Sequence, residues 1–278
     1  MYIIYMDQIE IHRAWGSLRK NGSHPPFLPA AQPVSLQKRH IKMLYTNNYY
    51  VSEKVDGVRM ALVCNSKFVG FINRKFDTMP VNFEVPDRFR RGTILDGEML
   101  DDGTYMVYDV IVICGKSVKH LNFNMRLFYI HKYLKDLPIK IKQFYSINNI
   151  EFLLNNASSN SVDGLIFTPW EDPVRVGTHD RMFKWKSLDK ITIDFRVENG
   201  KTYIQNRNRP VYVSNPPWAK DYPDNSIVEC CYSDKEWIPV KIRDDKDYPN
   251  SVITFDNTLI SIKENVNIND IIQIPGGA

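Results

Sequence analysis

Short β-type runs, spaced too irregularly for a βαβ repeat, most constrain what this chain can fold into. Residues 60–64 and 68–72 are apolar, and they predict a hairpin around the polar turn 65–67. Between such runs the spacing of Leu127, Ile130 and Leu134 predicts a helix over residues 124–137. Strands mixed with interspersed helices indicate an α+β fold.

The chain is expected to contain two domains. A proline-rich stretch, residues 22–33, reads as an extended arm, and Ser35 is a candidate cap for a helix over residues 36–45. After Phe195 only short strands separated by turn residues follow, which predicts a small β-barrel of about 80 residues. The expected domains are therefore residues 1–194 and residues 195–278.

Composition excludes little. Lys+Arg 36 against Asp+Glu 32 gives a formal net charge of +4, which suits an anionic substrate without naming one. The four cysteines, at 64, 114, 230 and 231, lack the spacing of a zinc site and are expected to be reduced thiols. No apolar run approaches the roughly 20 residues of a membrane helix, and residues 1–13 resemble no targeting peptide.

The most informative motif is EKVDGVR at residues 53–59. Lys54 is a candidate nucleophile, and neighbouring cations would favour its neutral form. Asp56 could orient Lys54, Gly57 lets the backbone approach a phosphate, and Arg59 offers a planar fork for phosphate or ribose. Taken alone, the motif could equally be a strand followed by an Asp-Gly turn.

Two acidic motifs follow in order, LDGE at residues 95–98 and VDGLIF at residues 162–167. Glu98 and Asp163 are the candidate ligands of a divalent cation, which needs one or two carboxylates when phosphate supplies other oxygens. The alternative is that both Asp-Gly pairs are ordinary hairpin turns.

Four further positions could contact a nucleotide. Tyr108 offers a ring for base stacking, or is a core aromatic, and Arg74 could hold ribose or phosphate, or is a surface arginine. Lys184 and Lys186 flank Trp185, so on a strand both would face one side and could stabilise charge on an α-phosphate. The alternative for this pair is a solvated edge strand.

After the EKVDGVR motif, the segment with the most candidate functional residues is 237–250, WIPVKIRDDKDYPN. Arg243 and Lys246 could grip a polyphosphate leaving group, or belong to a solvated charged turn. They lie in the expected barrel, so their action on Lys54 would require the two domains to meet.

Taken in order, these motifs resemble the covalent nucleotidyltransferase superfamily of DNA ligases, RNA ligases and mRNA capping enzymes. PAAQPVS at residues 29–35, KWK at 184–186 and the charged run at 237–250 are similar to the capping guanylyltransferases. The resemblance covers about residues 29–251. It departs at Lys241, where the family has an arginine, and at Ser187-Leu188, where it usually has a proline.

The resemblance implies a ligase-type, ATP-grasp-like nucleotidyltransferase domain followed by an OB-fold that closes over GTP and opens for RNA. It implies that Lys54 attacks GTP, releases pyrophosphate, carries GMP and passes it to a 5′-diphosphate RNA end, with Mg²⁺ or Mn²⁺ as cofactor. The implied site residues are Lys54, Lys184 and Lys186 for catalysis, Arg59, Arg74, Glu98, Tyr108, Lys184, Lys186, Arg243, Asp245 and Lys246 for GTP, and Glu98 and Asp163 for the metal.

Partners follow from the same resemblance. RNA triphosphatase and cap methyltransferase activities are expected on other chains, and RNA polymerase is a further expected partner, with no membrane involved. The location would be the nucleus for a cellular enzyme, or a cytoplasmic factory or virion for a viral one. Two rival readings are an ATP-dependent polynucleotide ligase and a non-catalytic module that binds RNA or polymerase.

Overall fold

The structure is a computed structural model, and it describes residues 8–156 and 164–272. The chain divides into two compact units, each built from separate stretches. The first comprises residues 1–34 and 44–184, and the second comprises residues 35–43 and 185–278. The expected boundary between residues 194 and 195 falls inside strand β13 (Thr192–Glu198) of the second unit. No helix among the described residues is both long and apolar enough to cross a membrane.

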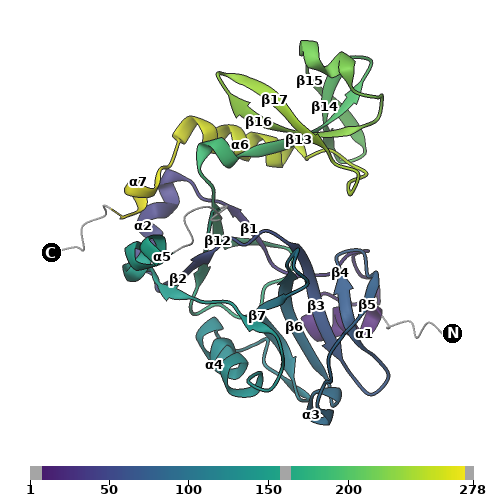
Figure 1. Cartoon of the computed structure of the whole chain (residues 1–278), viewed down its shortest axis with the longest axis vertical. Coiled ribbons are helices and arrows are strands. Elements are labelled where there is room, and N and C mark those ends of the chain that lie inside the picture. The colour runs from purple at the N-terminus through teal and green to yellow at the C-terminus, as the bar shows by residue number, and fades with distance from the viewer. Residues whose placement is uncertain (1–7, 157–163, 273–278) are drawn as a thin grey trace. The chain divides into compact units, whose positions relative to one another are not determined.

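Two sheets form the first unit (Figure 1). One has the order β1-β12-β11-β2-β10, and the other has the order β5-β4-β3-β6-β7-β8, with β9 paired in parallel to β7. Their bounds are β1 Gln32–Ser35, β2 Tyr49–Glu53, β3 Val58–Cys64, β4 Val69–Asn73, β5 Thr78–Pro80, β6 Thr93–Met99, β7 Tyr105–Ile113, β8 Lys116–Ser117, β9 Lys140–Ile141, β10 Tyr145–Ser146, β11 Leu165–Pro169 and β12 Thr178–Trp185. The predicted hairpin of residues 60–72 is the β3–β4 pair, in which Leu62 faces Phe71.

Strand β3 shows why the larger sheet is covered on both faces. Successive side chains of a strand point to opposite faces, so Leu62 joins one buried cluster while Ala61 and Val63 join another. Helix α4 (Phe123–Tyr133) covers the first face, and α1 (Gln8–Trp15) packs on the second. The remaining helices here are α3 (Asp87–Arg90), α5 (Ile150–Asn156) and the 3-10 turn Ile147–Asn149.

Two predicted helices form with altered ends. Helix α4 begins after Asn122, whose side chain accepts a hydrogen bond from the backbone N–H of Met125, and it ends four residues before the predicted end at 137. Helix α2 (Lys38–Thr46) starts later than predicted, and the expectation that Ser35 caps it is wrong. Ser35 instead ends strand β1.

An open antiparallel sheet in the order β15-β14-β13-β16-β17 forms the second unit. The other bounds are β14 Lys201–Asn206, β15 Arg209–Ser214, β16 Ile227–Ser233 and β17 Glu236–Ile242, with 3-10 turns at Leu188–Lys190 and Pro217–Asp221. This arrangement is OB-like, as expected, and among the described strands β15 and β17 are the edges of an open sheet and do not close into a barrel.

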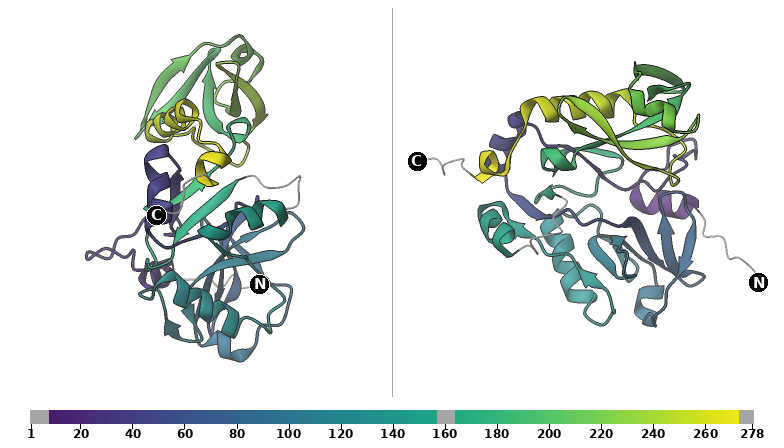
Figure 2. Two further views of the ribbon diagram at one scale, coloured as in Figure 1. Left: turned by 90° about the vertical axis from the view of Figure 1, so that its left-hand side faces the viewer. Right: turned by 45° about the horizontal axis from the view of Figure 1, so that its top comes forward.

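A long helix completes the second unit. Helix α6 (Val252–Glu264) contributes Val252 and Phe255 to the cluster around Phe195, and α7 (Ile268–Ile272) follows it. Figure 2 shows α6 running along the five-stranded sheet. Helix α6 was not predicted from the sequence.

Candidate active site

Lys54 lies where the chain crosses from one sheet of the first unit to the other. It directly follows β2, and its backbone N–H donates to the carbonyl of Gly164 at 2.8 Å, which extends the β2–β11 pairing by one residue. The next strand, β3, belongs to the other sheet. A strand followed by a bend at Asp56-Gly57 does form, but it joins two sheets and is not the turn of a hairpin, so the half-buried Lys54 side chain sits at a junction between sheets.

Gly57 allows this crossing to pass close to β6. A Cβ atom there would lie 2.5 Å from the carbonyl oxygen of Met99 and 2.9 Å from Cγ of Glu98, so any larger residue would push the crossing away. We expected Gly57 to permit the approach of a phosphate. The structure shows that it permits the approach of the strand that carries Glu98.

Glu98 lies inside β6 and not in a turn, so the hairpin alternative for Asp96-Gly97 is also wrong. Burial raises the pKa of the Glu98 carboxyl, while Lys142, Lys54 and Arg59 lower it. The fold thus gathers three cationic side chains around one half-buried carboxylate.

Lys142 is the member of this cluster that sequence reasoning missed. Its backbone N–H donates to the carbonyl of Val107 at 2.9 Å, directly after β9 has paired with β7, and three residues later Tyr145 pairs with Val51 of β2. Lys142 interacts electrostatically with both Glu98 and Lys54, so it belongs to the same charge cluster.

Burial lowers the pKa of Lys142 to about 8, with Glu98 opposing that shift and Lys54 adding to it. No pattern in the sequence separates Lys142 from Lys140, because both alternate with isoleucines in one short run. Lys142 is buried and Lys140 is exposed because the chain passes from β7 of one sheet to β2 of the other at this point.

Arg59, Asp96 and Tyr108 form a polar group beside Glu98. Arg59 donates to both carboxylate oxygens of Asp96, at 3.0 Å from Nε and 2.6 Å from Nη2, and the Tyr108 hydroxyl donates to Oδ1 at 3.3 Å. Burial alone lowers the pKa of Arg59, but Asp96 outweighs it and the net shift is upward. Arg59 and Lys142 both lie near the Tyr108 ring, 5.6 and 5.4 Å from its centroid.

Tyr108 owes its direction to a β-bulge. Asp96 faces Asp109 and Gly97 faces Val107, so Tyr108 has no partner on β6. Such bulges re-aim side chains and are common beside active sites. The ring is only half buried, and burial raises the Tyr108 pKa well above its usual value, so the hydroxyl keeps its proton.

Arg74 is an exposed residue of the β4–β5 turn. Its guanidinium lies 5.6 Å from the centre of the Phe27 ring, and its carbonyl accepts from the N–H of Leu28 at 3.0 Å. These contacts tie it to the proline-rich arm and not to the Glu98 cluster. The same arm supplies the carbonyl of Ala31 to Arg59 Nη1.

The predicted lysine pair divides between the units. Lys184 lies on β12 in the first unit, and Lys186 follows that strand in the second, where Nζ lies 3.5 Å from the carbonyl of Lys190. Trp185 is anchored between them, since its indole N–H donates to the carbonyl of Val266 at 2.7 Å. Asp163 lies outside the described residues.

The second unit gathers the charged residues of the 237–250 run around Asp194. Arg243 makes two 2.8 Å hydrogen bonds to Asp245 and lies 3.4 Å from Asp194, and Lys246 also pairs with Asp194. The bond to Asp245 is the largest cause that raises the Arg243 pKa, and it lowers the Asp245 pKa to about 2. The segment after β17 is thus an exposed turn at Asp244 and Asp245 whose charged side chains also pair with one another and with Asp194.

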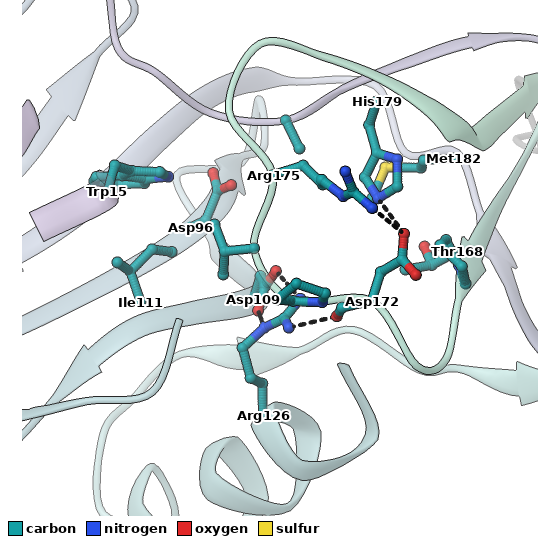
Figure 3. Close-up of a pocket in the computed structure, with 14 residues that line it drawn as sticks. Trp15, Asp96, Asp109, Ile111, Arg126, Thr168, Asp172, Arg175, His179 and Met182 are labelled. Carbon is teal, nitrogen blue, oxygen red and sulfur yellow. Dashed lines mark hydrogen bonds and ion pairs between the residues drawn. The ribbon is translucent and has the colours of Figure 1, made fainter. Parts of the chain in front are cut away.

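A pocket of the first unit lies next to this site (Figure 3). Asp96 lines it, together with Asp109, Arg126, Asp172 and His179, and none of the predicted site residues does. Burial lowers the pKa of His179 to about 4. Its ring is therefore neutral at pH 7, and its 3.5 Å contact with Asp172 is not an ion pair at that pH.

The residues present fit a divalent cation only together with a phosphate ligand. Among the residues that the structure describes, no cluster of three or more His, Cys, Asp or Glu side chains could hold a metal. Glu98 offers one carboxylate within a cationic cluster, which suits an ion that arrives with phosphate oxygens. All four cysteines are free thiols.

Comparison with solved structures identifies the fold. A mycobacterial DNA ligase D, described as complexed with ATP and MES, superposes with a TM-score of 0.50 and 12% identity over 78% of this chain and 94% of that one. At this identity the likeness shows the nucleotidyltransferase fold and carries no information on the substrate.

Comparison with sequence families is more specific. The model of the mRNA capping enzyme catalytic domain matches residues 8–188, and that of the mRNA capping enzyme C-terminal domain matches residues 159–272. An mRNA-capping enzyme of Danio rerio is 32% identical over 81% of this chain, and an mRNA-capping enzyme subunit alpha of Neurospora crassa is 26% identical over 88%. The chain spans 46% of the Danio rerio protein and 83% of the Neurospora crassa one. The chain therefore belongs to the mRNA capping enzyme family.

Proposed function

We propose that this chain is an mRNA guanylyltransferase. The observation that carries the proposal is the placement of Lys54 at the sheet junction, in one charge cluster with Glu98, Arg59 and Lys142. A partly exposed lysine held by a backbone hydrogen bond beside other cations is the arrangement that favours a lysine nucleophile.

In the proposed first step, neutral Nζ of Lys54 attacks the α-phosphorus of GTP. A P–N bond forms, the bond from the α-phosphorus to the bridging oxygen breaks, and pyrophosphate leaves with that electron pair. Nζ also releases a proton to solvent, which leaves GMP on lysine as a phosphoramidate. In the second step a terminal phosphate oxygen of a 5′-diphosphate RNA attacks the same phosphorus, the P–N bond breaks, and Lys54 takes up a proton.

The other residues keep the roles that the family resemblance suggests. Arg59, Arg74 and Glu98 bind ribose and phosphate, Tyr108 stacks on the base, and Lys184 and Lys186 contact the α-phosphate. Arg243, Asp245 and Lys246 act on the pyrophosphate, and Glu98 and Asp163 serve the metal site. A bound Mg²⁺ or Mn²⁺ would neutralise phosphate charge.

We also propose the division of labour between domains and partners. Residues 1–194 form the catalytic domain and residues 195–278 the OB-type domain. The enzyme works with RNA triphosphatase and cap methyltransferase activities and with an RNA polymerase, in the nucleus of a cell or in the factory or virion of a virus.

Incubation with α-labelled GTP or ATP and magnesium, followed by a denaturing gel, tests the proposal. A band labelled by GTP alone, acid-labile and absent from Lys54→Ala, is the expected result. Labelling by ATP instead would point to a polynucleotide ligase, and labelling by neither would point to a non-catalytic module.

A further inference from the structure

Arg126 is a buried arginine that the proposed chemistry does not use. It lies on α4 with 3% of its surface exposed. Its guanidinium donates to both carboxylate oxygens of Asp109, at 2.7 and 2.9 Å, and to the carbonyls of Leu121 and Asp172, at 2.6 and 2.8 Å. One side chain thus joins α4, β7 and the segment between β11 and β12 (Figure 3).

The bond to Asp109 acts on the residue beside it. Asp109 directly follows Tyr108, the bulged residue of β7 that lacks a partner on β6. A bulged residue lacks a partner in the ladder, so its direction depends on the contacts of its own side chain and on the anchoring of the residues next to it. The clamp on Asp109 therefore holds the Tyr108 ring beside Arg59 and Lys142.

The bond to Asp172 continues toward a second part of the site. The buried Asp172 carboxylate accepts a hydrogen bond from Nε of Arg181 at 3.1 Å. Arg181 lies on β12, three residues before Lys184. Arg126, Asp172 and Arg181 thus connect the strand of Tyr108 with the strand of Lys184 through hydrogen bonds.

We infer that Arg126 is a positioning residue of the nucleotide site, acting through Asp109 on Tyr108 and through Asp172 on β12. The inference rests on the proposed function. The described contacts of Arg126 are with Asp109, Leu121, Asp172 and the Phe123 ring, so it acts on the nucleotide only through others. Misplacing a binding group by about 1 Å costs on the order of 100-fold in rate, which makes such a role measurable.

The test measures the rate of GMP adduct formation against GTP concentration in wild type, Arg126→Lys and Asp109→Asn. Lysine keeps the charge but cannot make the two-point contact, and asparagine keeps the shape but loses the charge. Arg88→Lys is the matched control, because Arg88 pairs with Asp136 between α3 and the end of α4 and contacts no site residue. Thermal melting of each variant reports stability separately.

We expect Arg126→Lys and Asp109→Asn to raise the half-saturating GTP concentration by about tenfold or more, while the control matches wild type. Adding Tyr108→Ala should cost much less in these backgrounds than in wild type, since contacting residues are not additive. If Arg126→Lys does not fold, the half-saturating GTP concentration of Asp109→Asn alone tests the inference.

Two results would overturn the inference. One is a lower melting temperature with unchanged half-saturation, which is what a purely structural arginine would give. The other is full additivity with Tyr108→Ala. Failure of the wild type to be labelled by GTP would instead refute the proposed function, so the two failures are distinguishable.

Discussion

Arg59 of β3 and Asp96 of β6 form a two-point ion pair between neighbouring strands, with donor–acceptor distances of 3.0 and 2.6 Å. The Asp96 side chain is almost completely buried, whereas the Arg59 side chain keeps 29% of its surface exposed. Asp96 and the carbonyl of Ala31 therefore fix the orientation of a guanidinium on a side chain that is partly accessible.

Replacing Asp96 by asparagine should both destabilise the first unit and slow the reaction. The variant leaves Arg59 with a neutral partner, and losing a charged hydrogen bond at a buried position costs about 1–3 kcal/mol. Urea denaturation and the rate of GMP labelling would measure the two effects. Asp136→Asn is the control, since Asp136 is 63% exposed and its pair should contribute about 0–1 kcal/mol. Equal stability of both variants would contradict the prediction.

Lys54→Ala should abolish the covalent adduct and leave the fold intact, because its side chain is only half buried and its backbone hydrogen bond remains. A denaturing gel after incubation with α-labelled GTP, together with a melting curve, would show this. Lys67→Ala, at an exposed position between β3 and β4, provides the control and should label normally. Residual labelling of the Lys54 variant would mean that another residue carries the nucleotide.

Lys142→Met should move the acid limb of the pH–rate profile to higher pH. Among the charges that lower the Glu98 pKa, Lys142 contributes most, so its removal raises that pKa and Glu98 takes up its proton at a higher pH. Adduct formation followed between about pH 5 and pH 8 would show the shift. Lys140→Met, two residues away and exposed, should leave the profile unchanged. An unaltered acid limb in Lys142→Met would show that the protonation of Glu98 does not control the reaction rate.

Gly97→Ala should destabilise the first unit. A Cβ atom there would lie 2.5 Å from Cζ of Tyr105 and 2.6 Å from the carbonyl of Met106, and Tyr105 is nearly fully buried. Overpacking at such a site costs about 1–3 kcal/mol, which urea denaturation would resolve. Ser117→Ala, at an exposed position on β8, should be close to neutral. Wild-type stability of the glycine variant would mean that β6 and β7 shift apart easily.

Acidification should destabilise the protein through His179. Its pKa is lowered by burial to about 4, below the ordinary value of 6.5, so the unfolded chain binds the additional proton between these limits. Stability is therefore complete above about pH 6.5 and falls toward pH 4, by about 2 kcal/mol at pH 5 for this group. His179→Gln should flatten that slope in denaturation curves measured from pH 7 to 5. An identical slope in wild type and in His179→Gln would show that the protonation of His179 does not cause this loss of stability. His12 and His40, also lowered by burial, contribute with the same sign and remain in the variant.

The sequence was sufficient for elements whose pattern is local. The β3–β4 hairpin, helix α4 and the strand before Lys54 follow from apolar spacing and turn residues. It was insufficient where pairing is not local. The bulge at Tyr108 and the inclusion of Asp96-Gly97 within β6 depend on which strand lies alongside, which periodicity does not encode.

The same limit applies to the site. The order of motifs brought Lys54, Arg59, Glu98 and Tyr108 to notice, and the structure places them together. Lys142 joins them because residues 140–146 pass from β7 to β2, an event with no signature in composition. The open edge strands of the second unit and its helix α6 likewise depend on how distant strands pair.

The chain enters each compact unit twice, because residues 35–43 belong with residues 185–278. Within that second unit the backbone N–H of Lys38 donates to the carboxylate of Glu264 at 2.7 Å, across a separation of 226 positions. Neither unit is therefore an excisable module. A truncation that ends near residue 184 would keep residues 35–43 but lose residues 185–278, with which they form the second unit. A fragment that starts near residue 184 would lack residues 35–43, which carry most of helix α2. During synthesis residues 35–43 emerge long before residues 185–264, so the second unit cannot be completed until the ribosome has delivered Glu264.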